Sequence, residues 1–186
     1  MAALQPPPGL CGRGLVPQCA FPPQTPPAMP TKKSKIEARL SPIHGNGVFA
    51  KEPIKKGERV IQYKGVLRTH EEVDAEYGDE DENGHTFLFT LNDEYVIDAN
   101  KGANIARWMN HSCKPNCESE VEEDAKGRKD KDRIFINALR DIKPGEELTY
   151  NYGIVLDEPH TAKAKKLWAC RCGSKQCTGT MLQPKR

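Results

Sequence analysis

The sequence predicts one mostly β domain with few short helices, flanked by a proline-rich N-terminal tail and a small cysteine-rich C-terminal segment. Three observations predict it. Short runs of β-branched and aromatic residues, each bounded by turn residues, recur from Lys35 onward. Residues 1–31 hold nine of the 15 prolines, and three of the seven cysteines stand together near the C-terminus. With 186 residues, the chain is long enough to bury a core without disulfides.

The N-terminal tail, residues 1–31, has one charged residue, Arg13, and no periodic apolar pattern. Such a segment buries too little surface to offset its chain entropy, so we expect it to be disordered. Its prolines are compatible with a recognition segment. A dispensable extension or a misassigned start is the favoured interpretation.

The expected strands are short, and each is bounded by turn residues. They are residues 39–40, 47–50, 59–63, 86–91, 95–99, 134–138 and 148–150. Helical patterns are few and predict a polar helix at 70–77, a turn at 104–109 and a lysine-rich helix at 161–168. Residues 118–132 mix acidic and basic side chains and are interpreted as a solvated hairpin end. Helices are therefore expected to decorate a β core.

The charge balance argues against a nucleic-acid partner. Lys and Arg number 28 against 26 Asp and Glu, so the net charge is +2 and no basic stripe is evident. No run approaches the roughly 20 apolar residues of a membrane span, and the start lacks the layout of a secretory signal. We expect a soluble intracellular protein, cytoplasmic by default, with a nuclear location or secretion as an effector as alternatives.

The crowded cysteines Cys170, Cys172 and Cys177 predict a metal site. One residue separates the first two, a span too short for an unstrained disulfide, whereas both thiolates can bind one ion. Tetrahedral zinc requires a fourth ligand, and Cys113 is the leading candidate with Cys117 as its rival. The alternative is a set of free thiols that bind nothing.

Two further features are weak in isolation. Gly45 and Gly47 flank Asn46 and let the backbone approach a ligand, although such glycines more often form an ordinary turn. They lack the strand-before-helix context of a dinucleotide or phosphate loop. Tyr150 and Tyr152 are two residues apart, so on a strand their rings face the same side, either in a pocket or in the core.

These features occur together and in order, and residues 35–182 resemble a SET domain followed by a post-SET zinc segment. The motifs that carry the resemblance are residues 44–47, 63–65, 96–99, 107–116, 147–152 and 170–177. It implies a SET domain at 35–155 and a post-SET segment at 160–182. It also implies a β-clip fold with a pseudoknot, in which the segment bearing Asn110 and His111 threads through a loop near Tyr152.

The resemblance implies an S-adenosylmethionine-dependent protein-lysine N-methyltransferase. Tyr152 matches the tyrosine nearest the reacting centre, and Tyr63 and Tyr150 match tyrosines that line the lysine channel. Tyr150 stands where family members carry Tyr or Phe, and Tyr implies mainly monomethylation. The positions that match cofactor-binding residues are Gly45, Asn46, Gly47, Arg107, Asn110, His111 and Trp168. The zinc, held by Cys113, Cys170, Cys172 and Cys177, is expected to be structural.

The cysteine-rich module that precedes many SET domains is not matched, and the layout resembles compact members encoded by bacteria. The expected partner is a protein that presents a lysine, either a histone or another basic protein. Acidic residues between 71 and 82 can attract such a partner, although a solvated helix and loop is the simpler interpretation. The alternatives are a SET-like module that binds a lysine peptide without methylating it and a zinc-stabilised interaction domain. Oligomeric state is left open.

Overall fold

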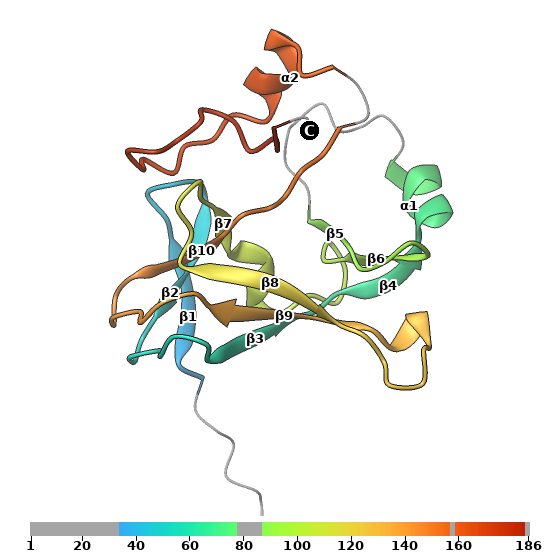
Figure 1. Ribbon diagram of the computed structural model, residues 1–186, viewed down its shortest axis with the longest axis horizontal. Helices are drawn as coiled ribbons and strands as arrows, with labels where there is room; N and C mark the ends of the chain where they lie inside the picture. Colours follow the sequence, from blue (N-terminus) through green and yellow to red (C-terminus); the bar gives the residue numbers. More distant parts are fainter. Residues whose placement is uncertain (1–33, 78–86, 157–158, 185–186) are drawn as a thin grey trace, which may run out of the picture. The chain divides into compact units, whose positions relative to one another are not determined.

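The computed structural model describes residues 34–77, 87–156 and 159–184, which belong to one unit spanning residues 33–186. This part of the chain contains ten short strands and few helices, as Figure 1 shows. The predicted fold class, mostly β with few short helices, is confirmed. The expectation of a disordered tail at 1–31 lies outside the described residues.

A four-stranded sheet joins the two ends of the domain in the order β1-β2-β10-β7. Strands β1 (Ile36–Leu40) and β2 (Asn46–Ala50) form an antiparallel hairpin, and β10 (Glu147–Tyr150) pairs antiparallel with β2. The two-residue strand β7 (Asn110–His111) lies parallel to β10. Segments about a hundred residues apart are thereby placed side by side.

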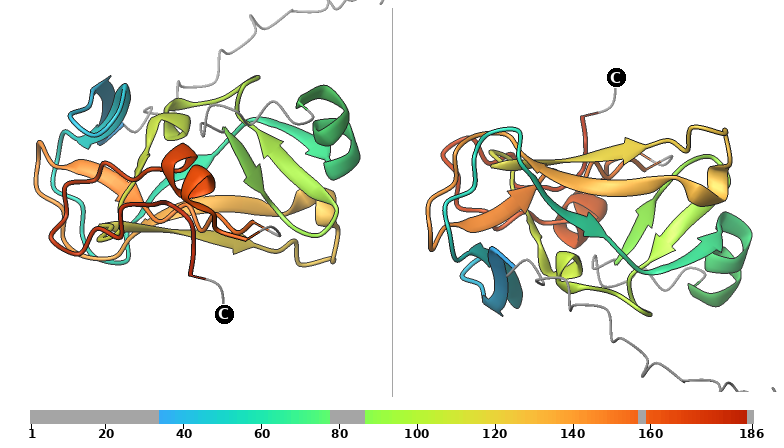
Figure 2. Two further views of the ribbon diagram at one scale, coloured as in Figure 1. Left: turned by 90° about the horizontal axis from the view of Figure 1, so that it is seen from above. Right: turned by 90° about the horizontal axis from the view of Figure 1, so that it is seen from below.

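Two three-stranded sheets complete the fold, with orders β3-β9-β8 and β4-β6-β5 (Figure 2). The first contains β3 (Arg59–Tyr63), β9 (Arg133–Ala138) and β8 (Cys117–Glu122). In β9, alternate residues are buried, as the period of two predicts.

The second small sheet contains β4 (Val66–Thr69), β6 (Tyr95–Asp98) and β5 (Leu88–Thr90). The core forms two clusters of buried side chains, one containing Ile136 and Leu148 and the other containing Ile134 and Ile97. Ile134 and Ile136 are two residues apart in β9 and belong to different clusters, so this strand connects the two clusters.

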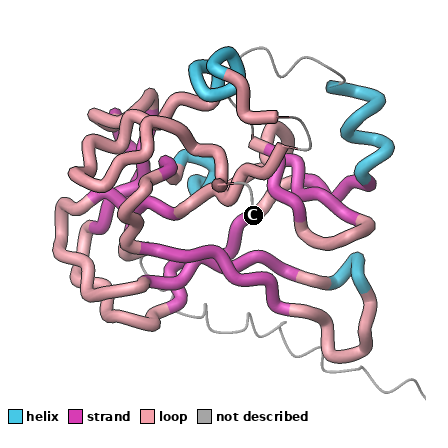
Figure 3. Tube along the Cα trace, turned by 45° about the horizontal axis from the view of Figure 1, so that its top comes forward, coloured by secondary structure: helices cyan, strands magenta, loops and turns pink. Residues whose placement is uncertain are grey.

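The two described α-helices lie outside this core (Figure 3), whereas a 3₁₀ helix contributes the buried Ala106 to it. Helix α1 (His70–Tyr77) buries only Val73, and the six-residue helix α2 (Ala162–Leu167) buries none of its residues. The 3₁₀ helices are η2 (Ile105–Trp108) and η3 (Lys129–Lys131). Thr161 caps α2 by accepting the backbone N–H of Ala164.

Three strands were not predicted: β4, β7 and β8. Residues 118–132 form the solvated end of a hairpin, as predicted, but the strand β8 within it, which pairs with β9 from Cys117 to Glu122, was not expected. Every residue of β8 after Cys117 is exposed, so its backbone is ordered by the sheet while its side chains show only a charged, solvated pattern. The two residues of β7 are too few to show any period.

The segment after β7 crosses β10. Ser112 donates its backbone N–H to the carbonyl of Tyr150 at 3.1 Å. The buried Asn116 donates Nδ2 to the Glu147 carbonyl at 2.8 Å and accepts the Thr149 N–H at 2.9 Å. These contacts are those expected of the predicted pseudoknot, and they fix the position of β10 relative to Asn110. Among the described helices, none has the length and apolar character needed to cross a membrane.

Candidate active site

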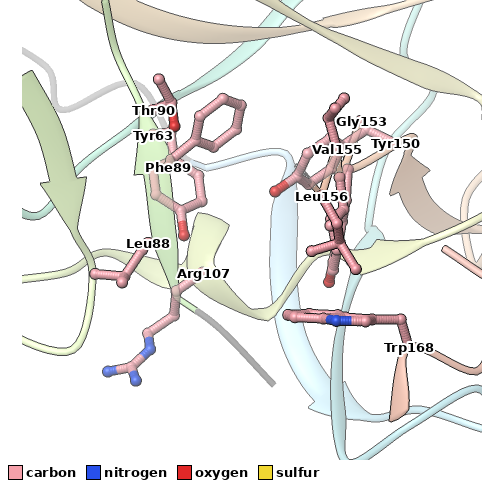
Figure 4. Close-up of a pocket in the computed structure, with 12 residues that line it drawn as sticks. Tyr63, Leu88, Phe89, Thr90, Arg107, Tyr150, Gly153, Val155, Leu156 and Trp168 are labelled. Atoms are coloured by element: carbon pink, nitrogen blue, oxygen red, sulfur yellow. The ribbon is translucent and has the colours of Figure 1, made fainter. Parts of the chain in front are cut away.

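The three tyrosines predicted to be catalytic share one pocket of about 580 Å³. Tyr63 is the last residue of β3, Tyr150 is the last residue of β10, and Tyr152 follows two residues later. Figure 4 shows Tyr63 and Phe89 on one side of the pocket, with the Trp168 ring lying across one end. The pocket therefore joins the central sheets to the C-terminal segment.

The pocket has aromatic walls whose rings are in contact. The centroids of the Tyr150 and Tyr152 rings are 4.9 Å apart, which agrees with the prediction that these rings face the same side. Phe89 stacks on Tyr150 with centroids 5.9 Å apart and meets Tyr63 edge-on at 5.1 Å. Phe89 was not predicted, because a phenylalanine within a short apolar strand gives no sign that it lines a pocket.

The three hydroxyl groups are neutral at physiological pH. Burial raises the pKa of Tyr63 to about 12, and it raises the pKa of Tyr150 and of Tyr152 well above the ordinary value. The Tyr152 hydroxyl donates to the backbone carbonyl of Met109 at 2.9 Å, which fixes its orientation. These phenols are suited to orient and polarise a ligand, and they are poor proton acceptors.

The glycine loop lies at the start of β2, away from the aromatic pocket. Gly45 has φ of +49°, a left-handed conformation that favours glycine, and both Gly45 and Asn46 are exposed. A Cβ on Gly47 would lie 2.3 Å from Glu147 Oε1 and 2.8 Å from the Cβ of Ser41. Close packing therefore requires glycine at position 47. The preceding residues Gly45 and Asn46 leave the backbone of the loop exposed.

The Asn110 side chain holds this loop. Its Nδ2 lies 3.0 Å from the carbonyl oxygen of Asn46, 3.3 Å from that of His44 and 2.8 Å from Glu147 Oε1. The Ser41 hydroxyl donates to the same Glu147 oxygen at 2.7 Å. Glu147 and Ser41 were not given roles from the sequence, because their contacts span about a hundred residues.

The buried His111 ring connects the end of β10 to the cysteines. Its Nδ1 accepts the backbone N–H of Tyr152 at 3.2 Å, and its Nε2 lies 3.6 Å from the Sγ of Cys113. Burial lowers the pKa of His111 to about 4, so the ring is neutral at pH 7. The Asn110–His111 pair thus contacts the glycine loop on one side and the C-terminal segment on the other.

Arg107 and Trp168 line the tyrosine pocket rather than the glycine loop. The Arg107 guanidinium lies over the ring of Phe87, 4.0 Å from its centroid, and its buried Nε has no hydrogen-bond partner among the residues that the structure describes. Trp168 ends α2 and is 5% exposed. Both side chains are therefore positioned to contact a bound molecule that extends from the tyrosines toward the C-terminal segment.

Four cysteines converge at the C-terminal segment. The Sγ atoms of Cys113, Cys170, Cys172 and Cys177 all lie within 4.8 Å of one another. The thiol of Cys170 accepts the backbone N–H of Cys172 at 3.5 Å, and that of Cys177 accepts the N–H of Gly179 at 3.4 Å. Backbone N–H donors stabilise thiolates, and four thiolates form a closed tetrahedral donor set for zinc.

The rival ligand Cys117 lies in a different environment from this cluster. It is fully buried in β8 among core residues, and burial raises its pKa to about 12. In contrast, the Sγ of Cys113 lies within 4.8 Å of those of Cys170, Cys172 and Cys177. The structure therefore favours Cys113 over Cys117 as the fourth member of the cluster.

Replacing Gly47 by alanine is expected to destabilise the protein by about 1–3 kcal/mol, because the added Cβ displaces Glu147 from Asn110 and Ser41. Chemical denaturation measures this loss. The control is Gly127→Ala in the β8–β9 hairpin, where φ is +68° and a Cβ meets no atom within 4 Å. It should cost only about 1 kcal/mol, since backbone strain acts alone. Equal losses in both variants would contradict the packing role of Gly47.

Comparison with known proteins gives the family. The family model described as "SET domain" matches residues 45–153, which is more than half of the chain. The chain belongs to the SET-domain family. The matched part of the SET domain contains the glycine loop, the Asn110–His111 pair and the three tyrosines, whereas three of the four clustered cysteines follow it.

Several relatives are named as histone-lysine methyltransferases. Human "Histone-lysine N-methyltransferase 2B" is 38% identical over 148 residues, which are 79% of this chain and 5% of that protein. Drosophila melanogaster "Histone-lysine N-methyltransferase trithorax" has the same identity over 148 residues, 79% of this chain and 4% of its own. The Candida albicans "Histone-lysine N-methyltransferase, H3 lysine-4 specific" is 37% identical over 156 residues, 82% and 14% respectively.

This chain therefore spans less than a sixth of the length of these relatives. All three come from eukaryotes, so the expected likeness to compact bacterial SET proteins stays a prediction.

Proposed function

We propose that the chain is an S-adenosylmethionine-dependent methyltransferase that transfers a methyl group to a protein lysine. The observation that carries the proposal is the convergence of three buried, neutral tyrosines on one pocket of a SET domain. The names of the relatives support the same reaction class.

The pocket fits a lysine side chain that must react as a neutral amine. A free lysine has a pKa near 10.4, so deprotonation at pH 7 costs about 4.6 kcal/mol. Aromatic walls formed by Tyr150, Phe89 and Tyr63 disfavour the charged ammonium and lower this cost. The hydroxyl groups of Tyr63 and Tyr150 orient the amine, while the Tyr152 oxygen stabilises positive charge on the methyl carbon.

The proposed cofactor residues are two groups on either side of His111. Gly45, Asn46, Gly47 and Asn110 form one group and offer the exposed loop backbone. Arg107 and Trp168 form the other, and the unpartnered buried Nε of Arg107 is a donor that a bound molecule would satisfy. When bound, S-adenosylmethionine supplies a methyl group on a positively charged sulfur.

A structural zinc ion is proposed at Cys113, Cys170, Cys172 and Cys177, because four thiols with backbone N–H donors suit that metal. Four thiolates close the coordination sphere, so this ion takes no part in the reaction. Its role is to fix the segment that carries Trp168 beside the pocket.

The proposed substrate is a lysine of a histone or of another basic protein. The names of the relatives indicate histone substrates for those proteins. The compartment of this chain is predicted to be cytoplasmic, with a nuclear site as an alternative, and it depends on which substrate is found.

The test is incubation of the purified, zinc-replete protein with labelled S-adenosylmethionine and a panel of basic proteins that includes core histones and the protein itself. Transfer of label to lysine supports the proposal and names a substrate. Cofactor binding with no transfer to any panel member would mean that the panel lacks the substrate or that a partner is needed. Absence of cofactor binding would contradict the proposal and favour the alternative, a SET-like module that binds a lysine peptide without methylating it.

Replacing Tyr150 by phenylalanine is expected to shift the product from monomethyl-lysine toward dimethyl- and trimethyl-lysine. The lost hydroxyl frees space in a pocket where the ring centroids of Tyr150 and Tyr152 are 4.9 Å apart. Mass spectrometry of the modified substrate measures the distribution. Mostly trimethyl-lysine from the unaltered enzyme, together with an unchanged pattern in Tyr150→Phe, would exclude a role for this hydroxyl in limiting methylation.

A further inference from the structure

The charges of this chain are segregated along the sequence, which the net charge of +2 conceals. All 26 acidic residues lie between Glu37 and Glu158, and residues 35–158 contain 18 Lys and Arg. Residues 159–186 contain seven Lys and Arg and no acidic residue. The SET body is therefore acidic, and the C-terminal segment is strongly basic.

The C-terminal cations are exposed and unpaired within the described residues. Five of them are described, and we name them the basic surface: Lys163, Lys165, Lys166, Arg171 and Lys175. Three come from α2 and two from the cysteine loop that follows it.

All ion pairs found in the described parts of the chain join residues between 35 and 146, such as Lys35 with Glu58 and Arg140 with Glu146. The basic surface thus keeps its full positive charge, whereas many body cations are neutralised.

This surface lies beside the proposed active site. Thr180 Oγ1 donates to the carbonyl of Trp168 at 3.0 Å, and the Sγ of Cys113 in the SET body lies 3.7 Å from the Sγ of Cys170. The C-terminal segment is therefore attached next to the pocket. In Figure 1, α2 and the coil that follows it lie together at the end of the described part remote from β3.

We propose that the basic surface binds the phosphate backbone of a double-stranded nucleic acid without reading its sequence. Unpaired lysines and arginines release condensed counterions from phosphates, which supplies most of the affinity in such contacts. An anionic membrane fits less well, because membrane-surface helices need a large apolar face. The exposed large apolar residues of the described chain are Leu40, Val66, Val121, Leu139 and Val155, none of them in the C-terminal segment. Such binding brings basic proteins that coat the same nucleic acid within reach of the pocket.

The experiment is a fluorescence-anisotropy titration of labelled duplex DNA of mixed sequence with the full zinc-replete chain, at several salt concentrations. The test variant carries Lys163→Gln, Lys165→Gln and Lys166→Gln. The matched control carries Lys51→Gln, Lys56→Gln and Lys126→Gln, which removes three exposed lysine charges from the body. No step of the assay depends on methyl transfer, so its outcome is independent of the proposed function.

The α2 variant should bind about tenfold more weakly or worse, and its slope of log affinity against log salt should fall by about 2.7. The body variant should keep the slope. A duplex RNA of the same length separates the two sources of phosphate: similar affinity means that the backbone alone is recognised, and a preference assigns the natural ligand. Absence of duplex binding, equal loss in both variants, or lysine-dependent capture by phosphatidylserine vesicles without duplex binding would each overturn the proposal.

Discussion

Replacing Tyr152 by phenylalanine is expected to lower kcat for lysine methylation by about 10²–10³-fold, with little change in KM. The Tyr152 hydroxyl donates to the Met109 carbonyl, so its oxygen is held in place and its lone pairs remain available in the pocket. Phenylalanine keeps the ring and its contact with His111 but lacks the hydroxyl oxygen, the only polar atom of the tyrosine side chain. Steady-state kinetics with labelled S-adenosylmethionine gives both constants.

The control for this substitution is Tyr95→Phe, which removes a hydroxyl from β6 outside the tyrosine pocket. It should leave kcat unchanged. Both variants should lose no more than about 1 kcal/mol of stability, the usual net effect of one hydrogen bond. If Tyr152→Phe retained more than half of the activity, the hydroxyl would have no part in stabilising the transferred methyl group.

Removing the zinc is expected to release the C-terminal segment from the body and to abolish methylation. Isolated zinc modules owe about 10–16 kcal/mol of apparent binding free energy to their metal, and α2 buries none of its own residues. The segment is attached through the cysteines, through the buried side chains of Trp168 and Leu182, and through backbone bonds such as Gln183 N–H to the Ile154 carbonyl. Chelation should therefore expose Trp168 while the SET body stays folded.

Metal content by mass spectrometry and the tryptophan fluorescence of a Trp108→Phe background report the two parts of this prediction separately. Cys113→Ser should lose zinc under a chelator challenge that the unaltered protein withstands. Cys117→Ala is the matched control: it should retain one zinc per chain and lose only core stability, because Cys117 is buried in β8. Retained zinc in Cys113→Ser together with loss in Cys117→Ala would assign the fourth ligand to the rival cysteine.

Local pattern predicted much of the fold. The predicted strand at 134–138 is part of β9, and the rings of Tyr150 and Tyr152 lie together as their two-residue spacing predicts, although β10 ends at Tyr150. The same reasoning missed β8, because its outward residues are charged and its pairing with β9 is made by the backbone. It also missed β7, whose order depends on lying against β10.

Motifs that occur in a specific order are sufficient to assign the family, and short spacing alone places three cysteines near one point. The choice between Cys113 and Cys117, which are four residues apart in one segment, required the folded chain. The chain turns after Cys113, so its thiol faces the C-terminal cysteines, whereas Cys117 enters the core in β8. The same holds for Glu147, which meets Asn110 and Ser41 across long stretches of chain. Contacts of this kind depend on how strands stack and cross, and no local period records them.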